Sequence, residues 1–400
     1  MAHVSISLSL FTQRLAKAIA GFLFLLALSM QTQADTLPEL RSDTTAVVRQ
    51  NLLDKVLGYF RTSNKRSLSK KPDFSIIGGP HYSNDTKLGL GLVAAGLYST
   101  DPADSTLFPS NFSLYGDVSS AGFYLIGIKG NHIFPHDSKR INYNIYLYSF
   151  TTYFWGIGYD DNRNNDNKTP YRDFRFTLNA DWLWHTGGHF YLGPAIEYNF
   201  IKATHIKKNE FLWNGQDHLT HNFGVGFNFR FDTRDHPTNP YKGFLVEIDQ
   251  RFYPRFLFNS NYNFSSTEFS ARNYTPVWKG GTVASIAHLN ITYGNTPWGL
   301  LPSLGGSSTM RGYYEGRYRD KTAADITVEL RQHIYGRSGA VVWAGAGCIQ
   351  PSLRKFRWRH ILPNYGVGYR WEFKKRTNVR LDLGFGKGEW GFLFNINEAF

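Results

Sequence analysis

Large apolar residues occupy every second position in segment after segment of this chain. From position 223 to 231 the sequence reads FGVGFNFRF, so that phenylalanine or valine alternates with glycine, asparagine or arginine. Successive side chains of a strand point to opposite faces, so this segment has one apolar face and one small or polar face. The same alternation recurs at 244–252, 326–334 and 390–400. The chain is therefore expected to consist mostly of strands.

The apolar faces are too large and too frequent for an ordinary soluble sheet. In hydrocarbon every backbone N–H and C=O must be paired, and strands achieve this only by closing into a barrel. We predict an all-β membrane protein, an antiparallel transmembrane β-barrel of about sixteen strands with an apolar outside and a polar lumen. The alternative is an aromatic-rich soluble β-sandwich, which rarely places charges on the second face of every strand.

Composition agrees with the barrel once the alternation is known. The mean hydropathy of −0.36 resembles that of a soluble protein, as expected when half of each strand faces water. Aromatic residues make up 16% of the chain, which fits lipid-facing strands flanked by interfacial girdles. The net charge of +13 is spread over strands and loops, so anionic lipid headgroups explain it better than nucleic acid, which we exclude as a partner.

Residues 1–34 are predicted to be a signal peptide. Arg14 and Lys17 precede an apolar run at 18–30, and small residues ending at Ala34 offer a cleavage site. The run is too short for a comfortable membrane helix, so export to the bacterial outer membrane is expected. Cys348 is the single cysteine, which excludes an internal disulfide, and its distance from the cleavage region argues against a lipoprotein.

Residues 35–72 form a predicted periplasmic segment with one amphipathic helix. Asp43 can cap a helix in which apolar residues recur every four positions, at Val48, Leu52, Val56 and Phe60. The helix would lie against the membrane face or plug the barrel mouth. The basic stretch 61–71 that follows is either a solvated linker or a contact with headgroups.

Residues 73–400 form the predicted barrel domain. Alternation and turn residues give strands at 73–80, 86–99, 111–119, 121–132, 139–150, 172–185, 188–203, 219–231, 242–253, 262–275, 280–293, 322–334, 339–348, 363–372, 376–386 and 389–400. Connections at one end are then short, as at 186–188 and 336–339, and three at the other end are long, at 151–171, 205–218 and 294–321. This asymmetry is typical of outer-membrane barrels, although the connection near Ser120 is tight for an outer loop.

Two segments are unusual for a passive pore. An inner turn carries Phe231, Asp232, Thr233, Arg234 and Asp235, followed by Asn239, Pro240 and Gly243. A long outer loop carries Leu304, Gly305 and Gly306, then Met310, Arg311, Gly312 and Tyr313. Together with 154–158 and 378–400, these segments resemble the surface-antigen barrel superfamily, whose members include outer-membrane protein assembly factors and two-partner secretion transporters. The resemblance covers residues 73–400.

The resemblance implies that the loop carrying Arg311, Gly312 and Tyr313 folds back into the lumen. Its arginine would pair with acids on the next two strands, and Glu329 matches the first of them. A guanidinium inside a barrel favours a bidentate carboxylate, and Glu329 has lumen parity. The second acid falls at Gly345, so one contact of this loop lock is expected to be missing. The alternative is an ordinary surface loop with an exposed arginine.

The resemblance also implies a lateral seam between the first and last strands. Residues 35–72 are too short for a polypeptide-transport-associated domain, so client capture would need a separate periplasmic partner. A seam requires a poorly paired first strand, and Gly78, Gly79 and Pro80 either weaken that strand or merely end it. Phe400 resembles the signal by which barrels are themselves inserted.

No catalytic or metal-binding pattern stands out. The histidine pairs His185 with His189 and His218 with His221 lack acidic or cysteine partners at metal spacing, so we expect neither a metal nor a cofactor. The leading interpretation is a non-enzymatic barrel that helps insert or translocate a polypeptide client, or a lipid, with a separate partner. The alternatives are a passive solute pore and, less favoured, an outer-rim hydrolase. The sequence assigns no oligomeric state.

Overall fold

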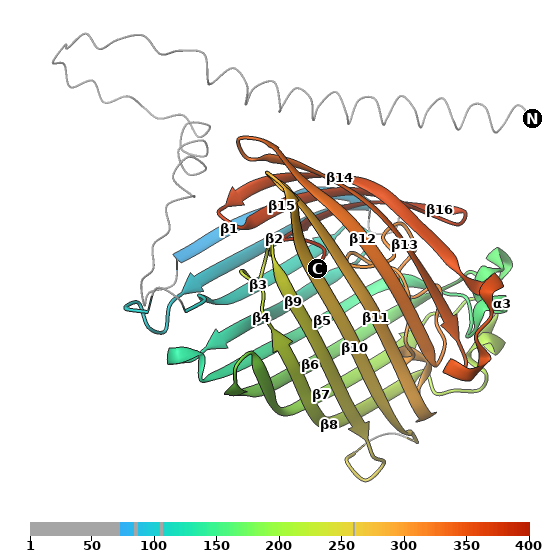
Figure 1. Cartoon of the computed structure of the whole chain (residues 1–400). Coiled ribbons are helices and arrows are strands. Elements are labelled where there is room, and N and C mark those ends of the chain that lie inside the picture. The colour runs from blue at the N-terminus through green and yellow to red at the C-terminus, as the bar shows by residue number, and fades with distance from the viewer. Residues whose placement is uncertain (1–72, 84–86, 105–106, 259–260) are drawn as a thin grey trace, which may run out of the picture. The chain divides into compact units, whose positions relative to one another are not determined.

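The computed structural model describes residues 73–83, 87–104, 107–258 and 261–400. The predicted signal peptide and amphipathic helix lie outside the described residues. The described residues form one antiparallel sheet in which each of sixteen strands pairs with its neighbours in the chain (Figure 1). The strands are β1 (Asp73–Ser83), β2 (Lys87–Tyr98), β3 (Ser110–Ser119), β4 (Tyr124–Ile133), β5 (Lys139–Phe154), β6 (Thr169–Gly187), β7 (Phe190–Thr204), β8 (Leu219–Asp232), β9 (Gly243–Tyr253), β10 (Asn263–Trp278), β11 (Gly281–Asn295), β12 (Thr322–Tyr335), β13 (Ser338–Gln350), β14 (Leu362–Lys374), β15 (Thr377–Gly386) and β16 (Glu389–Ile396).

The all-β antiparallel architecture is confirmed, and most strand ends lie within a few residues of the predicted ones. Strands β5 and β6 extend further into their connecting loop than alternation alone indicated, and β4 begins later, at Tyr124. Among the described pairings no ladder joins β1 to β16. Closure of the sheet into a barrel therefore stays a prediction.

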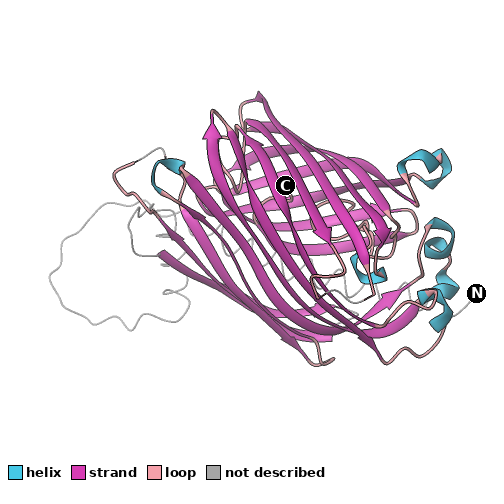
Figure 2. Cartoon of the chain, turned by 90° about the horizontal axis from the view of Figure 1, so that it is seen from below, coloured by secondary structure: helices cyan, strands magenta, loops and turns pink. Residues whose placement is uncertain are grey.

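The sheet carries apolar side chains on its exposed face and polar side chains on its buried face, which is the reverse of a soluble protein. On β8, Phe227 is 44% exposed whereas the next residue, Asn228, is 6% exposed. On β12, Val328 is 46% exposed and its neighbour Glu329 is completely buried. Apolar side chains thus cover the outer face, and polar and charged ones fill the inside of the curved sheet seen in Figure 2. This is the arrangement that a hydrocarbon surrounding would favour.

The two ends of the sheet differ in the length of their connections. Four long connections, at 155–168, 205–218, 296–321 and 351–361, share one end, which we call the loop end. The opposite end, the turn end, has two-residue turns after β6, β10, β12 and β14. Long connections at the turn end follow β2 and β8. Most connections thus follow the predicted asymmetry. The exceptions are these two and the short connections 120–123 and 387–388 at the loop end.

Short helices lie in the connections. They are η2 (Pro135–Asp137), α3 (Tyr159–Arg163), η3 (Asn165–Asn167), η4 (Glu210–Trp213), η5 (Trp298–Leu300), η6 (Leu353–Lys355) and η7 (Trp358–His360). Within the described ranges, none of the helices has both the length and the apolar character needed to cross a membrane.

The first and last strands differ from their predicted forms. Strand β1 continues through Gly79 and Pro80 to Ser83 and pairs with β2 along its whole length, so the alternative in which these residues merely end the strand is wrong. Strand β16 ends at Ile396 rather than at residue 400, because Asn397 adopts a left-handed φ of 71° and turns the chain away from the ladder.

Candidate functional site

The loop between β11 and β12, residues 296–321, packs inside the sheet at its tip. Met310, Tyr313 and Tyr318 of this loop form a buried cluster with residues of β12, β13 and β14. The tip turns sharply, with φ of 49° at Met310 and 109° at Gly312. A side chain at Gly312 would come within 2.5 Å of the Gly384 backbone on β15, so only glycine allows this close approach.

Arg311 at the tip is completely buried and contacts two carboxylates. One terminal nitrogen donates to Asp382 Oδ2 at 2.8 Å, and the other donates to Glu329 Oε1. Its guanidinium also lies 3.7 Å from the centroid of the Trp343 ring. The contact with Glu329 is the one that the family resemblance implies.

The expected loss of the second acidic contact is wrong. Asp382 on β15 supplies the second carboxylate, not a residue at position 345 on β13. A Cβ at Gly345 would come within 2.5 Å of the Ile326 carbonyl oxygen, so no side chain of any kind fits there without a shift. Strand β13 contributes the aromatic face of Trp343 instead.

Arg311 belongs to a closed ring of alternating charges, which we call the charge ring. Each member pairs with the next at 4.0 Å or less, and the side chains are at most 8% exposed. In order, the members are Arg311, Glu329, Arg331, Glu398, Arg370 and Asp382, which pairs again with Arg311. Every charge thus has at least two neighbours of opposite sign, as burial of ionised groups requires. Asp382 has a third, Arg380, at 3.3 Å.

The charge ring joins distant parts of the chain. Arg311 comes from the β11–β12 loop, and Glu398 comes from residues 397–400, which follow β16 and are called the tail here. Glu398 accepts hydrogen bonds from Arg370 Nε at 2.8 Å and from Asn378 Nδ2 at 2.6 Å. The loop tip and the end of the last strand are therefore parts of one buried polar network.

Phe400 lies inside the sheet, which corrects its predicted place on the apolar outer face. It is 9% exposed and packs with Tyr274, Ala284 and Ile286. Arg331 donates to its main-chain oxygen at 2.9 Å. The reason is the inward turn at Asn397, together with the pairing of Glu398. A role as an insertion signal stays a prediction.

Tyr313 fixes the tip to the last strands. Its hydroxyl donates to the Pro363 carbonyl oxygen at 2.7 Å and accepts from the Lys387 N–H at 2.7 Å. Burial raises the pKa of Tyr313 to about 12, so the hydroxyl keeps the proton that it donates. Glu389 on β16 binds the next part of the loop, accepting from Tyr314 N and from Arg317 Nη1, both at 2.7 Å.

The β8–β9 turn, residues 233–242, contains the predicted inner-turn motif. Arg234 makes a two-point contact with Asp232, both distances being 2.9 Å, and Thr233 bonds to the backbone of Phe244. Gly243 has a φ of 110°, and a side chain there would come within 2.3 Å of the Thr233 carbonyl oxygen. The motif residues therefore hold the shape of the turn.

This turn reaches across the turn end of the sheet. Asp235 pairs with Arg376, in the turn between β14 and β15, at 2.9 Å, and the Arg376 guanidinium lies 3.6 Å from the centroid of Tyr241. On its other side, His236 makes an edge contact with Phe108 of the β2–β3 connection, at 6.2 Å between ring centroids. The turn thus links strands that are far apart in the sheet order.

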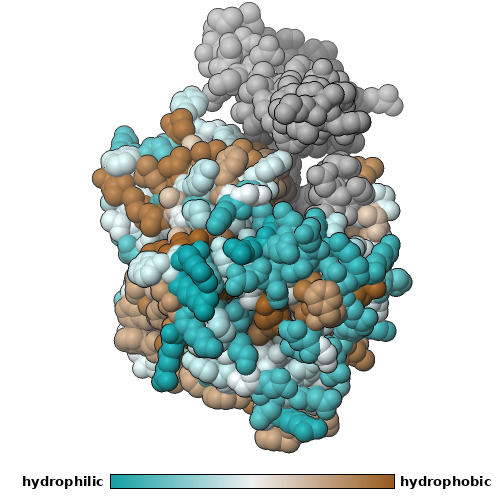
Figure 3. All heavy atoms as spheres, turned by 90° about the vertical axis from the view of Figure 1, so that its right-hand side faces the viewer, coloured by the Kyte–Doolittle hydropathy of each residue, from teal (hydrophilic) through white to brown (hydrophobic). Residues whose placement is uncertain are grey.

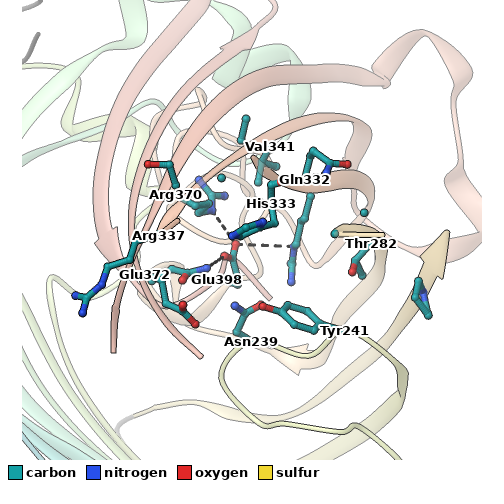
Figure 4. Close-up of a pocket in the computed structure, with 18 of the residues that line it drawn as sticks. Asn239, Tyr241, Thr282, Gln332, His333, Arg337, Val341, Arg370, Glu372 and Glu398 are labelled. Carbon is teal, nitrogen blue, oxygen red and sulfur yellow. Dashed lines mark hydrogen bonds and ion pairs between the residues drawn. The ribbon is translucent and has the colours of Figure 1, made fainter. Parts of the chain in front are cut away.

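A cavity of about 290 Å³ lies next to these groups at the turn end. Asn239 and Tyr241 of the β8–β9 turn line it together with Glu398 and Arg370. Figure 4 shows Arg370 and Glu398 directed toward one another beside this cavity. The tail, the β8–β9 turn and the charge ring therefore meet at one place.

The histidine pairs noted in the sequence are not brought into a metal-binding group. His185 bonds to the Gly188 carbonyl oxygen, and His218 lies 3.9 Å from Glu210. Across the described ranges no three histidine, cysteine or acidic residues are placed to hold a metal ion.

Sequence reasoning missed four members of the charge ring: Arg331, Arg370, Asp382 and Glu398. The alternation at 326–334 already puts Arg331 on the polar face with Glu329, although it was not named as a site residue. Asp382 has lumen parity on β15, so alternation could have placed it inside the sheet as well. Alternation could not have indicated which charges meet.

Comparison with known proteins identifies the family. Residues 126–352 match the Omp85 superfamily domain. The chain belongs to the Omp85 superfamily. Its membership makes it a protein of the outer-membrane β-barrel class, and the resemblance to the surface-antigen barrels is confirmed. The closing contact between β1 and β16 in this chain stays a prediction. No curated protein matches the chain.

Solved Omp85-type structures share the fold. BamA from Haemophilus ducreyi lacking POTRA domains 1–3 is 12% identical, with a TM-score of 0.51 over 89% of this chain and 79% of that one. CdiB from Escherichia coli is 11% identical, with a TM-score of 0.52 over 86% of this chain and 69% of that one. CdiB from Acinetobacter baumannii is also 11% identical, with a TM-score of 0.50 over 90% of this chain and 70% of that one. At these identities the likeness concerns the fold alone.

The change Glu329→Ala is expected to loosen the β11–β12 loop. It leaves Arg311 and Arg331 each without one carboxylate partner in a buried site, and breaking a buried pair costs about 3–5 kcal/mol. The measurement is limited proteolysis of the purified protein, with cleavage within 296–321 expected to become faster. Glu210→Ala, on the exposed β7–β8 loop, is the control. Identical loop cleavage in the Glu329→Ala variant and the unmodified protein would contradict the loop lock.

Proposed function

We propose that this protein is a non-enzymatic outer-membrane barrel that helps to insert or translocate a polypeptide, with a separately encoded periplasmic partner. The observation that carries the proposal is the charge ring, because it joins a loop inside the sheet to the residues that follow the last strand. In a second form of the same proposal, the client is a lipid. The sheet is taken to close as a barrel of sixteen strands with β1 beside β16.

A passive pore does not need a contact that joins a loop inside the sheet to the residues after the last strand. A pore conducts through an open lumen, whereas here the β11–β12 loop occupies part of the interior and the β8–β9 turn crosses the turn end. Both segments are held by charged contacts that cost energy to bury and that can rearrange in discrete steps. These features favour a barrel whose parts move in a coordinated way.

The two strands at the proposed seam differ in how they are held. Strand β16 is bound to the loop through Glu389, with Arg317 Nη1 at 2.7 Å, and to the charge ring through the tail. Strand β1 carries Gly78, Gly79 and Pro80, and a proline cannot donate a ladder hydrogen bond. We infer that β1 is the strand that yields, so that a client strand pairs with the exposed edge of β16.

Site-specific photocrosslinking tests this function. A photoreactive amino acid at Phe392 on β16, which is 63% exposed, is expected to capture a polypeptide client in cells that are making outer-membrane proteins. The matched control is Phe227 on β8, which is 44% exposed on the same outer face but eight strands away in the sheet order. Adducts at Phe392 and none at Phe227 support a client at the seam.

Other outcomes favour the alternatives. Equal labelling at both positions would indicate nonspecific contact with membrane proteins and would remove the seam from the proposal. Absence of adducts, together with large steady openings of the purified protein in planar bilayers, would favour the passive solute pore. The hydrolase alternative has no observation of its own in its favour.

A further inference from the structure

The connection between β13 and β14, residues 351–361, carries a concentration of positive charge at the loop end. Arg354, Lys355, Arg357 and Arg359 lie within six positions, all are exposed, and no acidic residue occurs in the connection. Like charges this close repel one another in water. The connection therefore carries a local excess of positive charge, which an anionic partner would neutralise.

These four cations have no acidic partner within the protein, as far as the described ranges extend. By contrast, Arg163 and Arg317 at the same end pair with Asp160 and Glu389, at 3.5 and 2.7 Å. Asp320 is influenced by the charge of Lys355, but no ion pair joins them. The charge of the β13–β14 connection is thus left available to a partner.

Apolar side chains are exposed among the cations. Leu353 is 55% exposed, Phe356 is 45% exposed and Trp358 is 80% exposed. The Phe356 and Trp358 rings meet edge to face, with 5.0 Å between their centroids. Tryptophan and phenylalanine beside arginine and lysine are the residues that enter a membrane interface, where the rings contact acyl chains and the cations contact headgroups.

The connection is anchored, so these side chains are presented in a fixed arrangement. His360 is 7% exposed, and its ring stacks on Tyr159 of α3 with centroids 4.1 Å apart. Burial lowers the pKa of His360, which keeps the imidazole neutral and adds no further positive charge. Backbone bonds within η6 and η7, such as Lys355 N to Ser352 O at 3.0 Å, hold the rest.

The connection follows directly on the apolar outer face of the sheet. Tyr365, near the start of β14, is 56% exposed on that face. Val342 and Val367, which pair with one another further from the connection, are 49% and 53% exposed. Figure 3 views the loop end, where hydrophilic side chains predominate and apolar ones form separate patches. Long loops of such barrels lie on the outer side, so the basic connection is expected at the outer boundary of the hydrocarbon layer.

We propose that residues 353–359 bind the phosphate groups of anionic lipids in the surrounding leaflet. The four cations contact the phosphates, while Trp358 and Phe356 enter the region below the headgroups. Each lysine or arginine near an anionic membrane contributes about 1 kcal/mol, which corresponds to roughly fivefold in affinity. This inference concerns lipid binding and does not depend on the proposed function.

The test measures lipid binding next to Trp358. The full-length protein is reconstituted in phosphatidylcholine vesicles, and a brominated lipid is added that quenches the fluorescence of a tryptophan in contact with it. Brominated phosphatidylglycerol and brominated diphosphoryl lipid A are compared with brominated phosphatidylcholine. Trp358→Phe identifies the part of the signal that comes from this residue.

We expect the anionic lipids to be preferred at Trp358 by roughly tenfold or more, and high salt to weaken the preference. The combined change R354Q, K355Q, R357Q and R359Q is expected to remove it. The matched control is K207Q with K208Q, which removes two exposed lysines from the β7–β8 loop at the same end and should leave the preference unchanged.

Three outcomes would overturn the inference. The first is an unchanged preference in the fourfold variant. The second is a loss of preference in the K207Q and K208Q control equal to that in the fourfold variant, which would indicate a general charge effect. The third is full displacement of the lipids by millimolar inorganic phosphate, which would show a site for the free anion rather than for a headgroup.

Discussion

Replacing Arg311 by alanine is expected to release the β11–β12 loop from the interior and to increase the conductance of the protein. The change leaves Glu329 and Asp382 with one fewer cation each, at positions where both side chains are completely buried. Removing one partner of an isolated buried pair costs about 3–5 kcal/mol. The cost here is expected below that range, because Glu329 keeps Arg331 and Asp382 keeps Arg370 and Arg380. The loop tip also loses its contact with the Trp343 ring.

Planar-bilayer recording of the purified protein measures the effect. The unmodified protein should give small, flickering openings, and Arg311→Ala should give larger and steadier ones. Its thermal unfolding temperature in detergent should fall as well. Arg163→Ala is the control, because the Arg163 and Asp160 side chains are 64% and 66% exposed and such surface pairs contribute little.

Glu398→Gln tests the contribution of the tail to the charge ring separately from that of the loop tip. This change frees the tail from Arg331 and Arg370 but leaves Arg311 with both of its carboxylates. We expect a smaller rise in conductance than with Arg311→Ala. Unchanged conductance and stability in the Arg311→Ala variant would contradict the loop lock.

A covalent link between β1 and β16 is expected to abolish the activity of the protein in cells. If a client pairs with β16 after β1 yields, a disulfide between the two strands prevents that step altogether. The experiment begins from Cys348→Ser and pairs Ile76→Cys with a cysteine at Phe392 or Phe394, to cover different registers. Growth or client insertion is then measured under oxidising and reducing conditions.

The control is a disulfide between strands that already pair. Leu381 on β15 lies opposite Phe394 on β16, so cysteines there should form a bond without restricting a seam. Activity that is lost only with the β1–β16 bond, and restored by reductant, supports lateral opening. Full activity in the presence of a complete β1–β16 bond would exclude it.

Much of the sheet could be predicted because alternation is a local property. The segment 322–334 was expected as a strand and is observed as Thr322–Tyr335, with Val328 outside and Glu329 inside. A side-chain period of two fixes which residues share a face, whatever the rest of the chain does. The last residues of β5 and the first residues of β6 were not predicted as strand. Pairing between the two strands continues there although the alternation becomes weak.

The site was predictable only in part, because alternation is local and does not determine which charges meet. The Arg311 and Glu329 contact followed from a motif and from parity. The second carboxylate was sought at position 345, the place that the family pattern indicates, yet Asp382 on β15 supplies it. Phe400 was assigned to the outer face because alternation was extended past Asn397, where the backbone turns inward.

The sequence by itself determined that this chain forms strands with an apolar face and a polar face, and that Arg311 and Glu329 carry opposite charges suited to the interior. Only the tertiary structure decided which charges meet. Glu398, Asp382 and Arg311 are separated by many residues along the chain, and the register of the sheet together with the turn at Asn397 brings them into one ring. Such contacts depend on how strands far apart in the sequence are placed, and no local pattern encodes that placement.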